Sequence, residues 1–300
     1  MTAVLDRPSE SSPEVGRRSP LRRRKPRSRA GKAGPITYTL VVLTALVSVF
    51  PLYWATVAGS HTNAEIAAKP PPFLPNATLF ENVARASEQA PMGLAILNSV
   101  LVSSAITVGT VLFCTLAGFA FAKLRFKGNG VLLSLVVGTM MVPTQLSVIP
   151  LFMMIADLQW VDQLQAVILP TLVSAFGVFF MRQYLSTALP DELLEAGRVD
   201  GASTHRIFFS IVLPVARPAM AVLGMLTFLT AWNEFFWPII ALTAANPTVQ
   251  VAIANLGSGY VPQRAVIMAG TLLGTLPVLA VFAVLGKQIV GGIMSGAVKG

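Results

Sequence analysis

The chain has 300 residues, of which 54% are hydrophobic and only 12% are charged, and its mean hydropathy is +0.69. Soluble globular domains contain about 25% charged residues, so this composition excludes an ordinary soluble protein and indicates an integral membrane protein. The formal net charge is +9 at pH 7. The positions of the basic residues indicate membrane topology and do not indicate nucleic-acid binding.

Residues 1–34 form a basic segment at the start of the chain. Ten of the 22 Lys and Arg residues lie here, among many Pro and Ser residues. A segment of this composition does not bury enough apolar surface to fold, so we expect a disordered cytoplasmic tail. Its expected role is a topology signal in contact with anionic membrane lipid.

Residues 35–300 are predicted to form an all-α transmembrane domain. A spanning helix needs about 20 mainly apolar residues, because the bilayer core offers no water to backbone polar groups. Six stretches meet this requirement, and the fifth contains one acid, Glu234. The predicted spans cover residues 36–59, 94–122, 131–155, 164–182, 218–240 and 265–286.

Proline residues recur inside the predicted spans and predict kinks, because each removes a backbone donor. Such kinks either border a transport pathway or are ordinary packing features, and the sequence leaves both readings open. The prolines concerned are Pro143, Pro150, Pro170, Pro238 and Pro277.

Basic residues predict the orientation of the spans. All but Lys69, Arg85 and Arg264 lie in the tail, in two loops or at the end of the chain. The positive-inside bias therefore places both termini in the cytoplasm. Residues 61–92, which are rich in proline, and residues 241–263, which are rich in Asn, Gly, Pro and Gln, are predicted to be loops outside the cytoplasm.

The loop of residues 189–217, between the fourth and fifth spans, is long for a simple connection. Pro190 suits the first position of a helix, and Gly201 suits the left-handed conformation that ends one. Ser203 or Thr204 caps a second helix, which we expect to stop at Leu213-Pro214. The sequence thus predicts two short helices, which either form a cytoplasmic knob or lie in the lipid interface.

This loop resembles the EAA loop of ABC importer permeases, in which several residues recur at fixed offsets. Gly197 stands where alanine is usual, which is expected to weaken the first helix by about 1 kcal/mol. The matching residues are Glu195, Ala196, Gly197, Asp200, Gly201, Ala202, Leu213 and Pro214.

The resemblance extends from about residue 36 to the end and is to maltose-type carbohydrate permeases. It is carried by Asn98-Ser99, Ala117-Gly118-Phe119-Ala120-Phe121-Ala122-Lys123, Arg125-Phe126, Met141-Val142-Pro143, Trp232-Asn233-Glu234-Phe235, Trp237-Pro238 and Ser295-Gly296-Ala297-Val298-Lys299-Gly300. The stretches 246–251 and 257–260 are similar to permeases for cellobiose and related β-glucosides.

The resemblance implies a type I permease fold with six spans in the plasma membrane of a bacterium. It implies a second homologous permease, two ATPase subunits and an extracytoplasmic solute-binding protein as partners, with a sugar as substrate. The EAA loop would couple this chain to the ATPase, with Glu195 and Ala196 in a cleft of that subunit and Gly201 setting the angle of the knob. ATP and Mg²⁺ would bind the ATPase, because this chain has no phosphate-binding GxxxxGK[ST] loop, and we expect no catalytic residue or metal site here.

The fifth span supplies a candidate substrate path. Aromatic rings stack on the apolar faces of sugars, and amide or carboxylate groups bind their hydroxyls. An interfacial aromatic belt, or simple packing, is the alternative explanation. The candidate residues are Trp232, Asn233, Glu234, Phe235 and Trp237.

Two other classes of protein are weighed against the importer. An ion-gradient-driven secondary transporter usually depends on several acids or histidines inside its spans, whereas these spans contain only Glu234. A membrane-embedded enzyme is disfavoured because neither an HExxH nor a GxSxG motif is present.

Overall fold

The computed structural model describes the backbone of residues 34–297 and the side chains of residues 34–283. The predicted tail therefore lies outside the described residues, except for Gly34, and the side chains of the terminal motif at 295–300 also lie outside them. The chain divides into two units, the first ending at Ser48 and the second beginning at Val49.

The regular elements in the described part of the chain are all helices. Four helical stretches are long and apolar enough to cross a membrane, and the number rises to six if each of two bent pairs counts as one span. The four are α1 (Pro35–Gly59), α4 (Met92–Lys123), the continuous stretch Thr204–Asn233 and the first 20 residues of α14 (Arg264–Ala297).

Two bent helix pairs lie where the sequence predicts the third and fourth spans, in which Pro143, Pro150 and Pro170 predict kinks. The third is α5 (Asn129–Thr139) followed by η1 (Thr144–Ser147) and α6 (Val148–Asp157), and the chain turns by 91° between them. The break falls at Pro143, which lacks the N–H needed to continue a helix. The fourth is α7 (Gln165–Ile168) with η2 (Leu169–Thr171), bent by 42° from α8 (Ala175–Ala188).

Short helices lie where the sequence predicts loops. The first predicted loop contains α2 (Asn63–Ala67) and the amphipathic α3 (Thr78–Gln89), which packs against α14. The prediction that residues 241–263 form only loop is wrong, because α13 (Val249–Leu256) lies there. Its buried residues Val249, Ala252 and Leu256 pack with Trp232, so tertiary contacts stabilise a helix that local composition disfavours.

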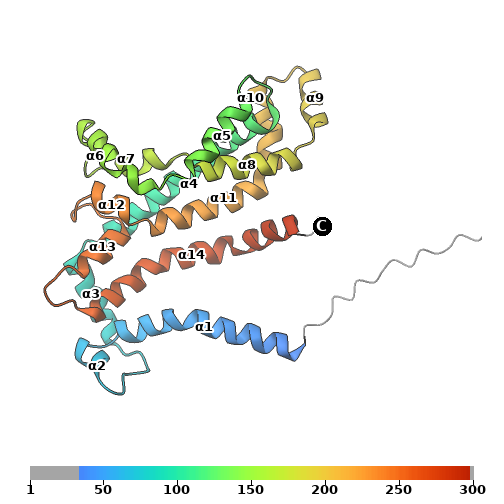
Figure 1. Ribbon diagram of the computed structural model, residues 1–300. Coiled ribbons are helices and arrows are strands. Elements are labelled where there is room, and N and C mark those ends of the chain that lie inside the picture. Colours follow the sequence, from blue (N-terminus) through green and yellow to red (C-terminus); the bar gives the residue numbers. More distant parts are fainter. Residues whose placement is uncertain (1–33, 298–300) are drawn as a thin grey trace, which may run out of the picture. The chain divides into compact units, whose positions relative to one another are not determined.

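The α4 helix packs along α8 and along α11 (Leu213–Asn233) in the unit that begins at Val49 (Figure 1). Small residues bring α4 and α8 close together. A Cβ atom on Gly118 would lie 2.7 Å from the backbone nitrogen of Arg182, and one on Gly177 would lie 2.7 Å from the Sγ atom of Cys114. Small residues at helix contacts are typical of membrane bundles, where close backbone approach replaces the hydrophobic driving force.

Buried side chains form clusters at the two ends of this bundle. One cluster joins the last turns of α4 to α8 and to residues 194–223, and includes Phe119, Met181 and Phe208. At the other end, where Figure 1 places α6, α7 and α12 (Phe236–Ala241), Val102 packs with Ile155. The core therefore links the helices that contain the candidate site residues.

Candidate functional site

The predicted coupling loop is a helical hairpin. Its first helix, α9, spans Asp191–Val199, so Pro190 is the N-cap residue and not the first helical residue. The helix ends in a Schellman motif, in which Ala202 N–H donates to Gly197 O at 2.9 Å and Gly201 N–H donates to Arg198 O at 3.0 Å. Gly201 has φ 75°, the left-handed conformation that the sequence predicts for it. This motif sets the direction in which the chain leaves α9.

The second helix begins at Ser203, whose hydroxyl accepts a hydrogen bond from Arg206 N–H at 3.3 Å. The prediction that this helix stops at Leu213-Pro214 is wrong. From α10 (Thr204–Ile207) it continues through a π-helical turn, η3 (Phe208–Val212), into α11. Pro214 lies in the first turn of α11, directly after the π turn, where the changed hydrogen-bond register accommodates the missing N–H. The hairpin is therefore continuous with a membrane span.

The two arms of the hairpin pack closely against each other. Leu194 of α9 is buried together with Ile207. A Cβ atom on Gly197 would lie 3.2 Å from Cδ1 of Ile211 and 3.3 Å from Cγ1 of Ile207. Glycine at this position, where the resembling family usually has alanine, lets α9 approach the second arm more closely than a larger residue would.

An ion pair joins the hairpin to a second span. Lys123 Nζ, at the end of α4, lies 2.7 Å from Asp191 Oδ1, and the Lys123 side chain is 9% exposed whereas that of Asp191 is 70% exposed. The hydrogen bond from Lys123 and its positive charge hold the pKa of the Asp191 carboxyl below its ordinary value. The contact is therefore fully formed at neutral pH and is lost only as the pH falls through this lowered pKa.

The outer surface of α9 is exposed and carries both charged and apolar side chains. Glu195, Ala196 and Asp200 are exposed, and Val199 is 86% exposed. A small recess of about 200 Å³ lies between the two arms and is lined by Gly197, Asp200, Ala202, Arg206, Ile207, Ser210 and Ile211. An exposed valine beside a charged helix face suits contact with another protein.

The candidate path residues lie where α11 ends and α12 begins. Trp232 is buried, packs against α13 and stacks on Phe228 with ring centroids 5.8 Å apart. Asn233 is exposed, and its side-chain amide donates to Leu229 O of its own helix at 2.8 Å. Of these two candidates, only Asn233 has an exposed side chain.

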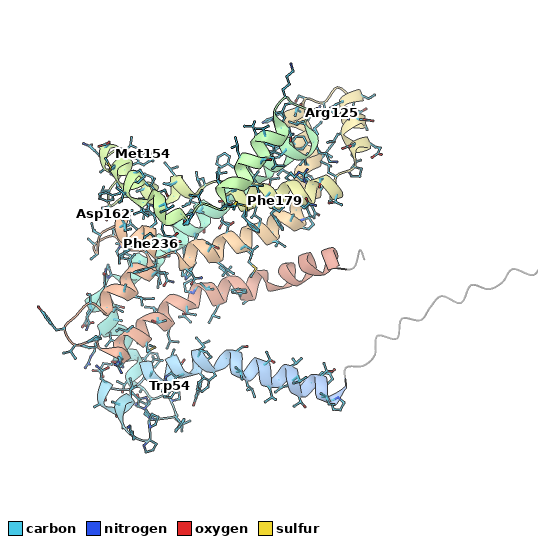
Figure 2. The ribbon with its side chains drawn as sticks, in the orientation of Figure 1. Trp54, Arg125, Met154, Asp162, Phe179 and Phe236 are labelled. Atoms are coloured by element: carbon cyan, nitrogen blue, oxygen red, sulfur yellow. The ribbon has the colours of Figure 1, made fainter. Side chains whose placement is uncertain are left out.

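Glu234 and its neighbours form a helix cap. Glu234 Oε1 accepts hydrogen bonds from the N–H groups of Phe236 and Trp237, at 3.0 and 3.2 Å, and so caps the short α12 helix. Trp237 is buried, and its indole N–H donates to Ala166 O at 2.9 Å. Phe235 is 40% exposed. The break thus exposes Asn233 and Phe235 and holds both tryptophans in packing contacts (Figure 2 labels the neighbouring Phe236).

Sequence reasoning missed a network of polar contacts at the end of the bundle opposite the hairpin. Asn98 of α4 is buried, and its amide donates to Asn246 Oδ1 at 2.8 Å and to Pro247 O at 3.0 Å. Asn246 in turn donates to Asp162 O at 2.8 Å. The hydroxyl of Ser99 accepts a hydrogen bond from Val249 N–H at 2.8 Å. The sequence indicated Ser99 only through the family resemblance and gave no partner for it. These contacts join partners far apart in the sequence, so no local pattern identifies them.

A groove of about 600 Å³ lies along α4 and α11 and reaches Val281 of α14. Its lining is almost entirely apolar, and Ser104 and Thr107 supply the hydroxyl groups. The lining residues are Ser104, Thr107, Val108, Val111, Leu112, Leu213, Met220, Ala221, Gly224, Met225, Phe228 and Val281. A sugar requires several polar partners, so this groove matches a sugar-binding site less well than the helix break does.

Apolar spans around a core, with a hairpin attached to two of them, define a multi-pass membrane protein of the permease class. The chain belongs to the family of binding-protein-dependent transport system inner membrane components, whose family model matches residues 111–291.

Several characterised proteins are similar over most of the chain. The lactose transport system permease protein LacG of Rhizobium radiobacter is 34% identical over 265 residues, covering 88% of this chain and 96% of that protein. The sn-glycerol-3-phosphate permease UgpE of Yersinia enterocolitica is 33% identical, covering 86% and 94%. The arabinooligosaccharides permease AraQ of Halalkalibacterium halodurans is 36% identical, covering 68% and 73%.

A solved structure supports the same fold. A chain of a bacterial ABC transporter involved in the import of the acidic polysaccharide alginate matches with a TM-score of 0.71 at 22% identity, covering 84% of this chain and 94% of that one. The protein is thus an ABC importer permease of the bacterial plasma membrane, and it is a transport subunit and not an enzyme. Its family works with a binding protein and an ATPase.

Proposed function

We propose that this chain forms half of the transmembrane path for a sugar or oligosaccharide and is driven through the α9–α10 hairpin by an ATPase subunit. The observation that carries the proposal is the physical continuity between the hairpin and the spans. Thr204–Asn233 is a single helical stretch of 30 residues, and Lys123 ties α9 to α4. A movement imposed on the hairpin therefore reaches two spans.

The exposed face of α9 is the proposed contact with the ATPase. Glu195 and Ala196 enter a cleft on that subunit, and the apolar side chain of Val199 is buried there. Asp200, Gly201 and Ala202 form the turn that orients the hairpin, while Leu213 and Pro214 mark its connection to α11. Closure of two ATPase subunits on ATP and Mg²⁺ then favours one arrangement of the spans, because only that arrangement keeps the contacts on both hairpins.

A second, homologous permease supplies the other half of the path, and an external solute-binding protein delivers the substrate. Both termini lie in the cytoplasm in this arrangement, as the distribution of basic residues predicts. In intact cells, a membrane-impermeant thiol reagent is expected to label Tyr260→Cys and to leave Glu195→Cys unlabelled. Labelling of both positions, or of Glu195→Cys alone, would overturn the proposed orientation.

The substrate path is proposed to run past the break between α11 and α12. Asn233 and Phe235 contact the sugar through an amide and a ring face, and Glu234 borders them. The buried Trp232 and Trp237 hold the break in shape.

The proposed substrate is a di- or oligosaccharide of the cellobiose type. The names of two similar permeases include lactose and arabinooligosaccharides, which supports a carbohydrate, whereas a third includes glycerol 3-phosphate. Titration of the associated binding protein with a panel of cellobiose, lactose, arabinooligosaccharides and glycerol 3-phosphate tests this choice. Preferential binding of cellobiose is expected, and preferential binding of glycerol 3-phosphate would exclude a sugar.

Transport by the assembled complex in proteoliposomes tests the function itself. Uptake is expected to require internal ATP and the binding protein, and to persist after ionophores remove all ion gradients. The alternative, an ion-gradient-driven secondary transporter, requires the opposite result in both respects.

A further inference from the structure

A proline-rich segment next to the end of α1 presents large apolar side chains to its surroundings. In the segment Pro70–Asn76, which precedes α3, Phe73 is 63% exposed and Leu74 is 76% exposed. Phe80, in the first turn of α3, is 79% exposed. Apolar side chains this exposed, this close together in sequence, indicate a surface that contacts something other than water.

The segment returns along the last turns of α1. The hydroxyl of Tyr53 donates a hydrogen bond to the carbonyl oxygen of Phe73, and Asn76 N–H donates to the Ser60 hydroxyl at 3.1 Å. Tyr53 lies six residues before the end of α1 at Gly59, which corresponds to about 9 Å along the helix axis. Tyr53 therefore holds the backbone carbonyl of Phe73 against α1, close to the end of the helix.

The end of α1 beside this segment belongs to the boundary between headgroups and hydrocarbon. The 25 residues of α1 extend about 37 Å, whereas the hydrocarbon core of a bilayer is about 30 Å thick. Tyr53 and Trp54, adjacent on α1 (Figure 2 labels Trp54), are the residue types that concentrate at this boundary. Phe73, which bonds to Tyr53 through its carbonyl, and its neighbour Leu74 therefore lie near this end of α1.

Little free energy is needed to transfer the backbone of this segment from water into the membrane interface. Pro70, Pro71, Pro72 and Pro75 have no N–H group, so four of the six residues from 70 to 75 have no donor to leave unsatisfied. The preceding residue, Lys69, is exposed and supplies one positive charge at the edge of the apolar stretch. Basic residues in this position favour lipid phosphate groups.

We infer that residues 70–75 are an interfacial membrane anchor, with Phe73 and Leu74 inserted among the lipids beside the end of α1 and Lys69 at the phosphate level. The anchor fixes the connection between α1 and α3. At its other end the segment leads into α3, which Asn82 holds on the end of the span by donating to Gly59 O and His61 O at 2.9 Å each.

Spin labelling of the assembled importer in lipid nanodiscs tests this inference. A nitroxide is attached at Leu74→Cys or at Tyr260→Cys, each in a Cys114→Ala background whose uptake is first shown to be normal. Tyr260 is the matched control, because it is a fully exposed large side chain in another connecting segment, between α13 and α14. Collisions of each label with oxygen, which partitions into lipid, are compared with collisions with a water-soluble nickel chelate.

The label at position 74 is expected to collide several-fold more often with oxygen than with the chelate, and the label at position 260 is expected to show the reverse. Equal access of the chelate to both labels would overturn the anchor. Protection of position 74 that appears only when the binding protein is added would also overturn it, by identifying a protein contact instead of lipid. Neither result depends on the coupling role of α9, so the two proposals fail separately.

Discussion

The Nζ atom of Lys123, the last residue of α4, lies 2.7 Å from the Oδ1 atom of Asp191, the first residue of α9. One end of the hairpin is thus held by an ion pair to one span, and its other end is covalently continuous with α11. The chain already joins α9 to α8 through Leu189 and Pro190, so the ion pair adds α4 as a further span to which the hairpin is attached.

Asp191→Asn is therefore expected to lower ATP-driven uptake several-fold, because the neutral amide removes the charge attraction between α9 and α4 and Lys123 keeps a poorly hydrated charge. Glu81→Gln is the matched control. It removes the acid of the exposed pair between Glu81 and Arg85, 2.6 Å apart within α3, and is expected to leave uptake unchanged. The double variant Lys123→Asp with Asp191→Lys is expected to recover part of the lost uptake. Equal uptake by Asp191→Asn and Glu81→Gln would contradict the role of the pair.

Gly201→Ala is expected to impair coupling, because an L-residue at φ 75° costs about 1 kcal/mol and the strain distorts the Schellman turn. Gly128→Ala imposes the same kind of strain, at φ 83° and also with open space for the added carbon, but between α4 and α5. The measurement is ATPase activity stimulated by the loaded binding protein, which should fall for Gly201→Ala and stay near normal for Gly128→Ala. A similar loss in both variants would mean that backbone strain in general is responsible.

Asn98→Ala is expected to lower the stability of the folded chain by about 1–3 kcal/mol. The substitution removes the buried amide that donates hydrogen bonds to Asn246 Oδ1 and Pro247 O, and leaves both oxygens without this donor. The midpoint of thermal unfolding in detergent should fall by several degrees. Asn233→Ala is the control for stability, since that exposed amide bonds only to its own helix. An unchanged midpoint for Asn98→Ala would show that the network does not stabilise this end of the bundle.

Glu234→Gln and Glu234→Ala together separate two roles of this residue. Glutamine retains a side-chain oxygen that accepts from Phe236 N–H and Trp237 N–H, whereas alanine removes the cap. Because Glu234 borders the proposed sugar path, loss of its charge in Glu234→Gln is expected to lower uptake at least several-fold while thermal stability stays normal. Normal uptake by Glu234→Gln with loss only in Glu234→Ala would assign Glu234 to capping alone.

Local sequence was sufficient for the long apolar helices and for the turn of the hairpin. Spanning helices follow from composition alone, and the end of α9 follows from Gly201, whose conformation few other residues adopt. The cap at Ser203 is equally local. These features depend on residues that are neighbours in the chain.

Features that depend on distant partners could not be predicted. The α13 helix forms because its apolar face packs against Trp232, and the helix through Pro214 continues because a π turn precedes it. The aromatic and polar stretch at 232–237 indicated a functional region, but no sequence pattern shows that Trp232 and Trp237 point into the core. Their burial leaves Asn233 and Phe235 as the exposed members of the set.

Crosslinking from the tip of the hairpin tests the central claim most directly. In cells that produce the complete importer, Glu195→Cys in a Cys114→Ala background is treated with a short bifunctional reagent, and Lys127→Cys in the loop between α4 and α5 serves as the exposed control. A crosslink from position 195 to the ATPase subunit, absent or much weaker from position 127, is the predicted result. Reaction of position 195 with lipid or with no partner, while the ATPase is present and folded, would contradict the account.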